Sequence, residues 1–234
     1  MIIFYGLLIA HLIADFMQPA SLVRWSKQHW TGLVLHSLGY VVLSALVILG
    51  APFFIVWLLI LGLSHYAVDR IKYFIGPKIP GWELIIFLVD QLIHIVIIAG
   101  VSWYLLISSG STLTFFEQYV KNYAVALPYV VAYIIATFSV SILVFEVDRT
   151  VCTWTGKTKC ATVITFKDRL IGMLERALAV TFVLINPLFF LFPFAFSYSF
   201  FRVLRDKECV EVNWTDLSVS ISCALVIALL LRFS

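Results

Sequence analysis

Long apolar runs alternate with short polar segments along most of this chain. Each run approaches or reaches the length of a transmembrane helix, which needs about 20 mostly apolar residues. The sequence therefore predicts an all-α protein, a polytopic transmembrane helical bundle of about seven spans. The predicted spans cover residues 2–17, 31–49, 53–74, 82–107, 123–145, a stretch from about 170, and 217–231.

Glycine and proline mark where several of these runs end. Gly50-Ala51-Pro52 predicts a tight turn between the second and third spans, and Gly76-Pro77 separates the third from the fourth. Pro187 and Pro193 interrupt the sixth run, so we expect a kinked or broken span there. We expect one integral-membrane domain over 1–234, with a four-span core at 1–107 and three further spans in 122–234.

Composition supports a membrane location. Hydrophobic residues make up 62% of the chain, charged residues only 12%, and the mean hydropathy is +1.04. Soluble domains usually contain about 25% charged residues, so this composition argues against a soluble protein. The net charge of +3 reflects loop lysines and arginines. We therefore expect membrane lipids, and not nucleic acid, as the surroundings of this protein.

Loop charge predicts the orientation. Most of the 16 lysines and arginines fall on one side of a seven-span arrangement, many of them in the loop 146–169. Basic loops are typically cytoplasmic, which places the N-terminus outside, the C-terminus inside and the loop 146–169 in the cytoplasm. The first ten residues carry no basic charge, so we expect a retained span and not a signal peptide. The predicted location is the cell (inner) membrane.

Histidine and aspartate recur at a four-residue step inside the apolar runs. His65 precedes Asp69, His11 precedes Asp15 and Asp90 precedes His94 by four residues, and a lone His36 lies in the second run. On a helix, residues four apart share one face. Polar ligand-type residues are costly inside a membrane, which makes them candidates for a functional site.

The four spans run in alternating directions and bring these residues to a similar depth, about 5 to 15 Å below the cytoplasmic surface. Neutral imidazole and carboxylate bind zinc, iron and manganese, and a site without thiolates favours catalysis. The sequence therefore predicts one metal site near the cytoplasmic face, holding one or two ions. Zinc is the first choice, with manganese or iron as alternatives. The predicted ligands are His11, Asp15, His36, His65, Asp69, Asp90 and His94.

Other residues could take part in catalysis. One of Asp15, Asp69 and Asp90 could act as the base on a metal-activated water. Lys72 shares a face with Asp69 and could stabilise anionic charge, or simply extend toward the membrane surface. Glu175, early in the sixth span, could reach the metal or belong to a solvated helix face. Gln18 and Gln91 could orient ligands or substrate.

These motifs resemble a known family. The segments 11–18, 65–72 and 90–94, together with His36, resemble an uncharacterised prokaryotic family of polytopic membrane proteins, known only as a domain of unknown function. The run 172–176 resembles that family's C-terminal half. The histidine and aspartate spans are also similar to LexA-regulated inner-membrane proteins described as metal-dependent hydrolases. That resemblance implies hydrolysis without naming a substrate.

Three functions follow as hypotheses. The leading one is a membrane-embedded metal-dependent hydrolase that acts on a lipid or lipid-linked substrate, with a phosphoester preferred. The second is a transporter of divalent cations or protons that uses the same residues as a transit site. The third is a structural membrane protein whose polar residues only join helices.

Overall fold

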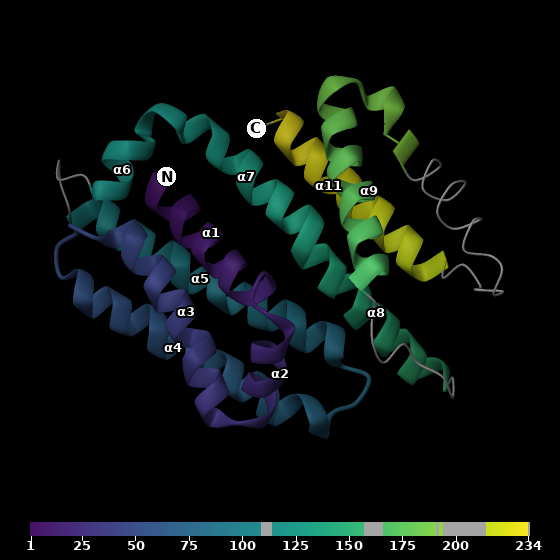
Figure 1. The fold of residues 1–234 in the computed structure, drawn as a ribbon, viewed down its shortest axis with the longest axis horizontal. Coiled ribbons are helices and arrows are strands. Elements are labelled where there is room, and N and C mark those ends of the chain that lie inside the picture. Colours follow the sequence, from purple (N-terminus) through teal and green to yellow (C-terminus); the bar gives the residue numbers. More distant parts are fainter. Residues whose placement is uncertain (109–113, 157–165, 191, 194–213, 234) are drawn as a thin grey trace. The chain divides into compact units, whose positions relative to one another are not determined.

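The computed structural model describes residues 1–108, 114–156, 166–190, 192–193 and 214–233, and every regular element in these ranges is helical (Figure 1). The predicted all-α class is confirmed. The chain divides into two compact units, Met1–Val131 and Ala132–Ser234. The sequence predicts one domain with a four-span core at 1–107 and three further spans in 122–234, and in the structure the residues up to Val131 belong to the first unit.

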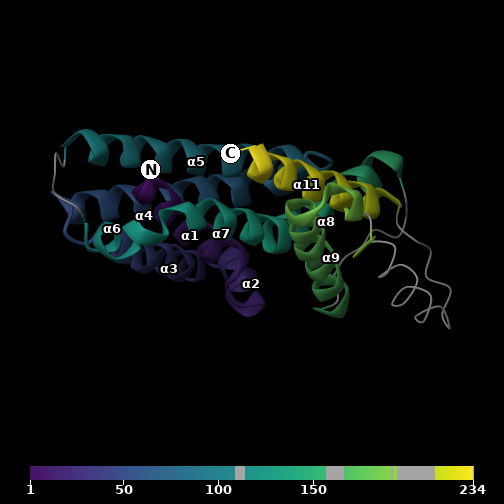
Figure 2. The ribbon, with the colours of Figure 1, turned by 90° about the horizontal axis from the view of Figure 1, so that it is seen from above.

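Four helices of the first unit form a closed ring. Helix α1 contacts both α3 and α5, and α4 also contacts both, so that each ring member has two neighbours. Figure 1 and Figure 2 both show α3, α4 and α5 lying lengthwise beside one another. A shorter helix, α2, packs on α3. The helices are α1 (Ile2–Phe16), α2 (Ala20–Gln28), α3 (Trp30–Ile48), α4 (Phe54–Ile75), α5 (Glu83–Ser108) and α6 (Phe115–Val120).

The inside of this ring is apolar over much of its length. Leu7, Leu61, Ile98 and Leu105 are buried there, and none exposes more than 1% of its surface. The outside of the ring is apolar too, and carries exposed side chains such as Leu63, at 66%. A helix that is apolar on all sides is typical of a membrane span. The first unit therefore has the surface expected of a protein surrounded by lipid.

Among the residues that the structure describes, four helical stretches are long and apolar enough to cross a membrane: Trp30–Ile48, Phe54–Lys78, Glu83–Ser108 and Phe115–Thr155. The predicted second, third and fourth spans match three of these. The predicted first run, 2–17, matches α1, which ends at Phe16, and a second helix leaves α1 at 84°. Pro19 precedes α2 and lacks the backbone N–H that would continue α1. The polar segment 20–28 forms this second helix.

The second unit contains a π-helix within its first long helical stretch. Residues Ile135–Ser139 form this turn, between α7 (Leu127–Ile134) and α8 (Val140–Thr155). Two further helices, α9 (Phe166–Ile185) and α11 (Trp214–Phe233), pack on it through small buried residues that include Ala136, Ala179 and Ala224. As predicted, the sixth apolar run is broken, since α9 ends before Pro187.

The predicted loop 146–169 is wrong at both ends. Helix α8 continues to Thr155 and α9 begins at Phe166, and residues 157–165 between them lie outside the described part of the chain. The polar residues at the start of this segment are spaced for a helix, and Arg149 pairs with Glu146 three residues earlier at 3.4 Å. Polarity here marks a helix continuing beyond the apolar zone and not the end of regular structure.

Candidate metal centre

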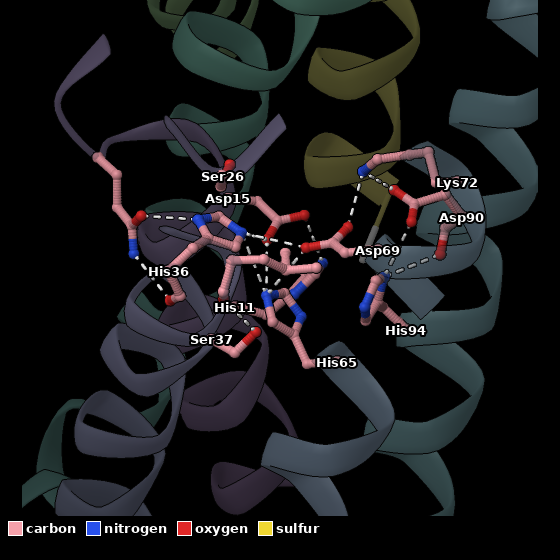
Figure 3. Close-up of polar contacts among 12 residues, drawn as sticks. His11, Asp15, Ser26, His36, Ser37, His65, Asp69, Lys72, Asp90 and His94 are labelled. Atoms are coloured by element: carbon pink, nitrogen blue, oxygen red, sulfur yellow. Dashed lines mark hydrogen bonds and ion pairs between the residues drawn. The ribbon is translucent and has the colours of Figure 1, made fainter. Parts of the chain in front are cut away.

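The structure brings the seven predicted ligands together in the first unit. Two residues come from α1, one from α3, two from α4 and two from α5, and their side chains point into the ring (Figure 3). Six of the seven are buried, and the side chain of Asp15 is only 6% exposed. The four-residue steps place both members of each pair on the inner face of their helix. The ligands are His11, Asp15, His36, His65, Asp69, Asp90 and His94.

Four of these side chains direct one atom each toward a common point. The Nε2 atom of His36 lies 3.2 Å from Asp69 Oδ2 and 3.7 Å from Asp15 Oδ1. The Nε2 atom of His65 lies 3.4 Å from Asp15 Oδ1 and 3.6 Å from Asp69 Oδ2. The two Nε2 atoms are 3.4 Å apart. We call these four residues the tetrahedral group.

These separations fit the edges of a coordination tetrahedron. Zinc binds nitrogen and oxygen ligands at about 2.0–2.1 Å, which puts neighbouring ligand atoms about 3.3 Å apart. The five measured edges range from 3.2 to 3.7 Å. The buried atoms Asp15 Oδ1 and Asp69 Oδ2 have no hydrogen-bond partner. Unpartnered buried oxygens are costly, so this group is suited to a cation at its centre.

Gln18 fixes the orientation of His36. Its Oε1 atom accepts a hydrogen bond from His36 Nδ1 at 2.7 Å, and its Nε2 donates to the His36 carbonyl at 3.2 Å. With the proton on Nδ1, the lone pair of His36 lies on Nε2, which faces the tetrahedral group. Such support of a ligating histidine by a hydrogen-bonded neighbour is typical of metal sites.

Lys72 joins two of the carboxylates. Its Nζ atom lies 2.8 Å from Asp69 Oδ1 and 2.8 Å from Asp90 Oδ2, and its side chain is 22% exposed (Figure 3). The ammonium therefore holds Asp69 by one oxygen while the other oxygen faces His36 and His65. The role of Lys72 toward an anionic substrate stays a prediction. In the structure, Lys72 holds the carboxylate of Asp69 in position.

Gln91 connects the remaining residues. Its Nε2 donates to Asp15 Oδ2 and to Asp90 Oδ2, both at 3.0 Å, and its Oε1 faces His11 Nε2 at 3.3 Å. The ligand atoms of His11, His65 and His94 lie within 4.8 Å of one another, and so do those of Asp15, Asp90 and His94. The site is thus one continuous cluster of possible ligands, larger than a single coordination shell.

Two residues near the cluster were not singled out from the sequence. The ring of Tyr40 is buried and packs on His65 at 4.8 Å and on His11 at 5.7 Å between centroids. Gly39 leaves room for Gln18, because a Cβ atom there would lie 2.6 Å from Gln18 Nε2. The position of Tyr40, four residues after His36, was the signal that could have found it.

Glu175 belongs to the second unit. It lies in α9 and is buried, next to the buried Arg176. The groups of possible metal ligands found among the described residues do not include it. Its predicted catalytic role stays a prediction.

Fold and site together define a helical protein with membrane-length apolar helices and a buried histidine–aspartate centre. The chain belongs to the DUF3307 family of proteins of unknown function, whose model matches residues 3–123. This range contains all seven clustered residues, and it confirms the predicted membership in a family known only as a domain of unknown function. Comparison with curated proteins and with solved structures found no match.

Proposed function

We propose that this protein is a membrane-embedded, metal-dependent hydrolase of a lipid or lipid-linked substrate. The observation that carries the proposal is the tetrahedral group, in which two imidazole nitrogens and two carboxylate oxygens converge at 3.2–3.7 Å. This mixed donor set and spacing suit zinc. Manganese and iron, which share these ligands, are the alternatives.

With Asp15 acting as the base and not as a ligand, a metal held by His36, His65 and Asp69 would keep its fourth position for a water, polarise the substrate and make that water acidic enough to react near neutral pH. Asp15 is the best candidate for the base. Asp69 and Asp90 are each bound to the Lys72 ammonium, whereas the second oxygen of Asp15 accepts from the neutral amide of Gln91 at 3.0 Å and lies 3.7 Å from His11 Nε2. Asp15 is also the most exposed of the three carboxylates, at 6%. Its lone pair is thus the one most free to accept a proton.

The reaction proposed is addition of water across a phosphoester, with ester and amide substrates as alternatives. The water oxygen bonds to phosphorus, and the bond from phosphorus to the leaving oxygen breaks. Asp15 takes one proton from the water and returns it to the leaving oxygen, so that an alcohol and a phosphomonoester result. Lys72 keeps Asp69 in place during this step through their 2.8 Å ion pair.

Several features favour a lipid substrate. The cluster lies within apolar helices whose outer faces expose large side chains, among them Leu63 and Leu92. We propose about seven spans, with the N-terminus outside, the C-terminus inside and the site near the cytoplasmic face of the inner membrane, from the loop charges. We propose the same reaction class as that of the LexA-regulated inner-membrane proteins that the histidine and aspartate motifs resemble.

Transport of a cation or proton is the second hypothesis, and the buried side chains disfavour it. A transit path needs polar groups on both sides of the cluster. In the described part of the first unit, the core along α1, α4 and α5 away from the cluster is built mainly from Leu7, Leu61, Ile98 and Leu105. Flux of metal or protons in proteoliposomes, without turnover of any lipid, would favour transport over hydrolysis.

Metal analysis of the purified protein tests the first step. We expect at least one equivalent of zinc in the wild type, and the loss of at least one equivalent in His65→Ala and in Asp69→Ala. The matched control is His29→Ala, because His29 is exposed and lies between α2 and α3. A zinc content equal to that of the wild type in both site variants would show that the tetrahedral group does not hold metal.

Activity is then measured on lipid phosphoesters presented in mixed micelles. We expect turnover that a chelator abolishes and zinc restores, with Asp15→Asn losing turnover while keeping most of the metal. If the polar residues only join helices, substitution lowers thermal stability while the wild type has neither metal nor activity.

A further inference from the structure

Three imidazole rings converge beside the tetrahedral group. His11, His65 and His94 are 0%, 0% and 3% exposed, and each offers a ligand atom within 4.8 Å of the other two. The rings of His11 and His94 stack with centroids 4.7 Å apart, and His65 lies 4.7 Å from His94. Three polar rings in such contact inside an apolar bundle are costly unless their nitrogens have partners.

Hydrogen bonds fix which nitrogen of His94 is free. Its Nδ1 atom lies 2.9 Å from the carbonyl of Asp90, one turn earlier on α5, and must donate there because a carbonyl only accepts. The lone pair of His94 is therefore on Nε2. That atom is buried and has no hydrogen-bond partner.

The same reasoning applies to His11. The Nε2 amide of Gln91 donates to Asp15 and Asp90, which identifies the atom facing His11 as the Gln91 carbonyl oxygen. His11 Nε2 must donate to it across 3.3 Å, which leaves the lone pair on Nδ1. His11 Nδ1 is also buried without a hydrogen-bond partner.

His65 lies between the two sets of atoms. Its Nε2 belongs to the tetrahedral group, at 3.4 Å from Asp15 Oδ1, and its Nδ1 is buried without a hydrogen-bond partner. Metal ligands normally donate their second nitrogen to a carboxylate, a carbonyl or water. Gln18 serves His36 in this way, whereas no such acceptor is within reach of His65 Nδ1 in the described part of the chain. The rings of His11 and His94 pack against that of His65, with centroids 5.6 and 4.7 Å away.

We propose that His11, His65 and His94 form a second metal position, and that the His65 imidazole bridges it to the metal of the tetrahedral group. The bridge forms when the bound metals displace the remaining ring proton of His65 to solvent. This inference rests on the proposed metal site and adds a second, all-nitrogen position to it. One half of this two-metal centre would contain carboxylates and the other half only histidines. The histidine-only half suits zinc or copper.

The set of possible ligands formed by Asp15, Asp90 and His94 is a weaker candidate for the second metal position. Asp90 Oδ2 already accepts from Lys72 at 2.8 Å and from Gln91 at 3.0 Å, and His94 Nδ1 donates to a carbonyl. The three-histidine set instead has one lone pair on each of His11 and His94 with no other partner. Asp15 Oδ1 already belongs to the tetrahedral group, so the carboxylate set adds two buried atoms without a hydrogen-bond partner, Asp90 Oδ1 and His94 Nε2. The three-histidine set has three, His11 Nδ1, His65 Nδ1 and His94 Nε2, so a cation there satisfies more of them.

Zinc stoichiometry of the full-length protein in detergent micelles is the first test. After loading and removal of free zinc, we expect two equivalents in the wild type and one in His11→Gln and in His94→Ala. Asp69→Ala should also retain one, held at the three-histidine position. Stoichiometry is taken only from monodisperse fractions, and the wild-type value alone tests the proposal if a variant does not fold.

Copper(II) loading gives a second readout that is independent of activity. Two copper ions joined through one imidazole couple magnetically, so the wild type should show fewer unpaired spins by electron paramagnetic resonance than its copper content. His94→Ala should show one uncoupled copper. One zinc per wild-type chain, unchanged in His11→Gln and His94→Ala, would overturn the second position and leave the proposed function standing. No bound zinc would overturn both.

Discussion

Gln18 holds His36 at two atoms, accepting from its ring Nδ1 at 2.7 Å and donating to its backbone carbonyl at 3.2 Å. Gln18 lies just beyond the end of α1, and His36 is in the first half of α3. The pair therefore ties the end of one helix to the ligand of another. It also keeps the His36 lone pair directed toward Asp15, Asp69 and His65.

Gly39→Ala should weaken metal binding without direct contact with any ligand. The new Cβ would lie 2.6 Å from Gln18 Nε2, so the amide must move and His36 loses its support. Loss of such support typically costs 10–100-fold in metal affinity, and we expect about that decrease. Competition with a chromophoric zinc chelator measures it.

The matched control is Gly100→Ala, because Gly100 lies in α5 and a Cβ there meets nothing within 4 Å. This variant should bind metal as the wild type does. An equal loss in both variants would mean that Gly39→Ala acts through general destabilisation of the bundle. Unchanged affinity in Gly39→Ala would mean that Gln18 does not support a ligand.

Lys72→Met should destabilise the metal-free protein. Lys72 separates two buried carboxylates, Asp69 and Asp90, by bonding each at 2.8 Å. Removal of one partner from a buried ion pair costs about 3–5 kcal/mol, because an uncompensated charge remains. We therefore expect a lower melting temperature in detergent, and a larger gain on adding zinc than in the wild type, since the cation replaces part of the lost charge.

Arg70→Met is the control for this experiment, since Arg70 is exposed on the same helix. It should change the melting temperature little. The double variant Lys72→Met, Asp90→Asn should recover part of the stability, because it leaves only one of the two carboxylates charged. No recovery would argue that Lys72 acts through packing of its chain and not through charge.

The sequence predicted much of the first unit because its signals are local. Chain breaks such as Gly50-Ala51-Pro52 separate apolar runs, and the ends of α3, α4 and α5 lie within a few residues of the ends of these runs. The four-residue steps, as in His65 and Asp69, determine which face of a helix carries the ligands. Alternating directions then bring those faces to one depth, so the meeting of the seven residues follows from periodicity.

Other features depend on contacts that periodicity does not contain. The 84° bend after Phe16 arises where Pro19 interrupts the backbone hydrogen bonds, and hydropathy does not register it as a change of direction. The choice of ring nitrogen on His36 depends on Gln18, and the packing of Tyr40 depends on two other helices. Polarity after Glu146 predicts a loop, whereas α8 continues to Thr155.

The proposed orientation predicts the reactivity of two engineered cysteines. Lys78 lies in the turn between α4 and α5, and Phe53 in the turn between α3 and α4, and both side chains are exposed. With the N-terminus outside, Phe53→Cys should react with a membrane-impermeant maleimide in intact cells. Lys78→Cys should react only after the cells are opened.

Labelling of the wild-type chain, which has four native cysteines, measures the background reactivity. The reverse pattern of labelling would place the metal site near the outer face. That result would leave the metal proposal intact and reverse the side from which a lipid substrate enters.

Arg176→Met should destabilise the second unit selectively. The buried guanidinium donates to the carbonyls of Ala136 and Thr137 at 2.6 and 3.2 Å, and to the hydroxyls of Ser141 and Ser220. Both carbonyls belong to the π-helix. The Thr137 carbonyl keeps a hydrogen bond from the Ser141 hydroxyl at 2.6 Å, so the loss falls on the Ala136 carbonyl, and a buried carbonyl without a partner costs about 1–3 kcal/mol.

Hydrogen exchange in detergent locates this effect. Peptides from 132–156 should lose protection in Arg176→Met, while those covering α3 to α5 stay protected and zinc content is unchanged. Arg149→Met is the control, because Arg149 is 42% exposed and pairs with Glu146 at 3.4 Å, an interaction worth at most about 1 kcal/mol. Loss of zinc in Arg176→Met would show that the second unit is needed to hold the metal site, which the contacts within the first unit do not predict.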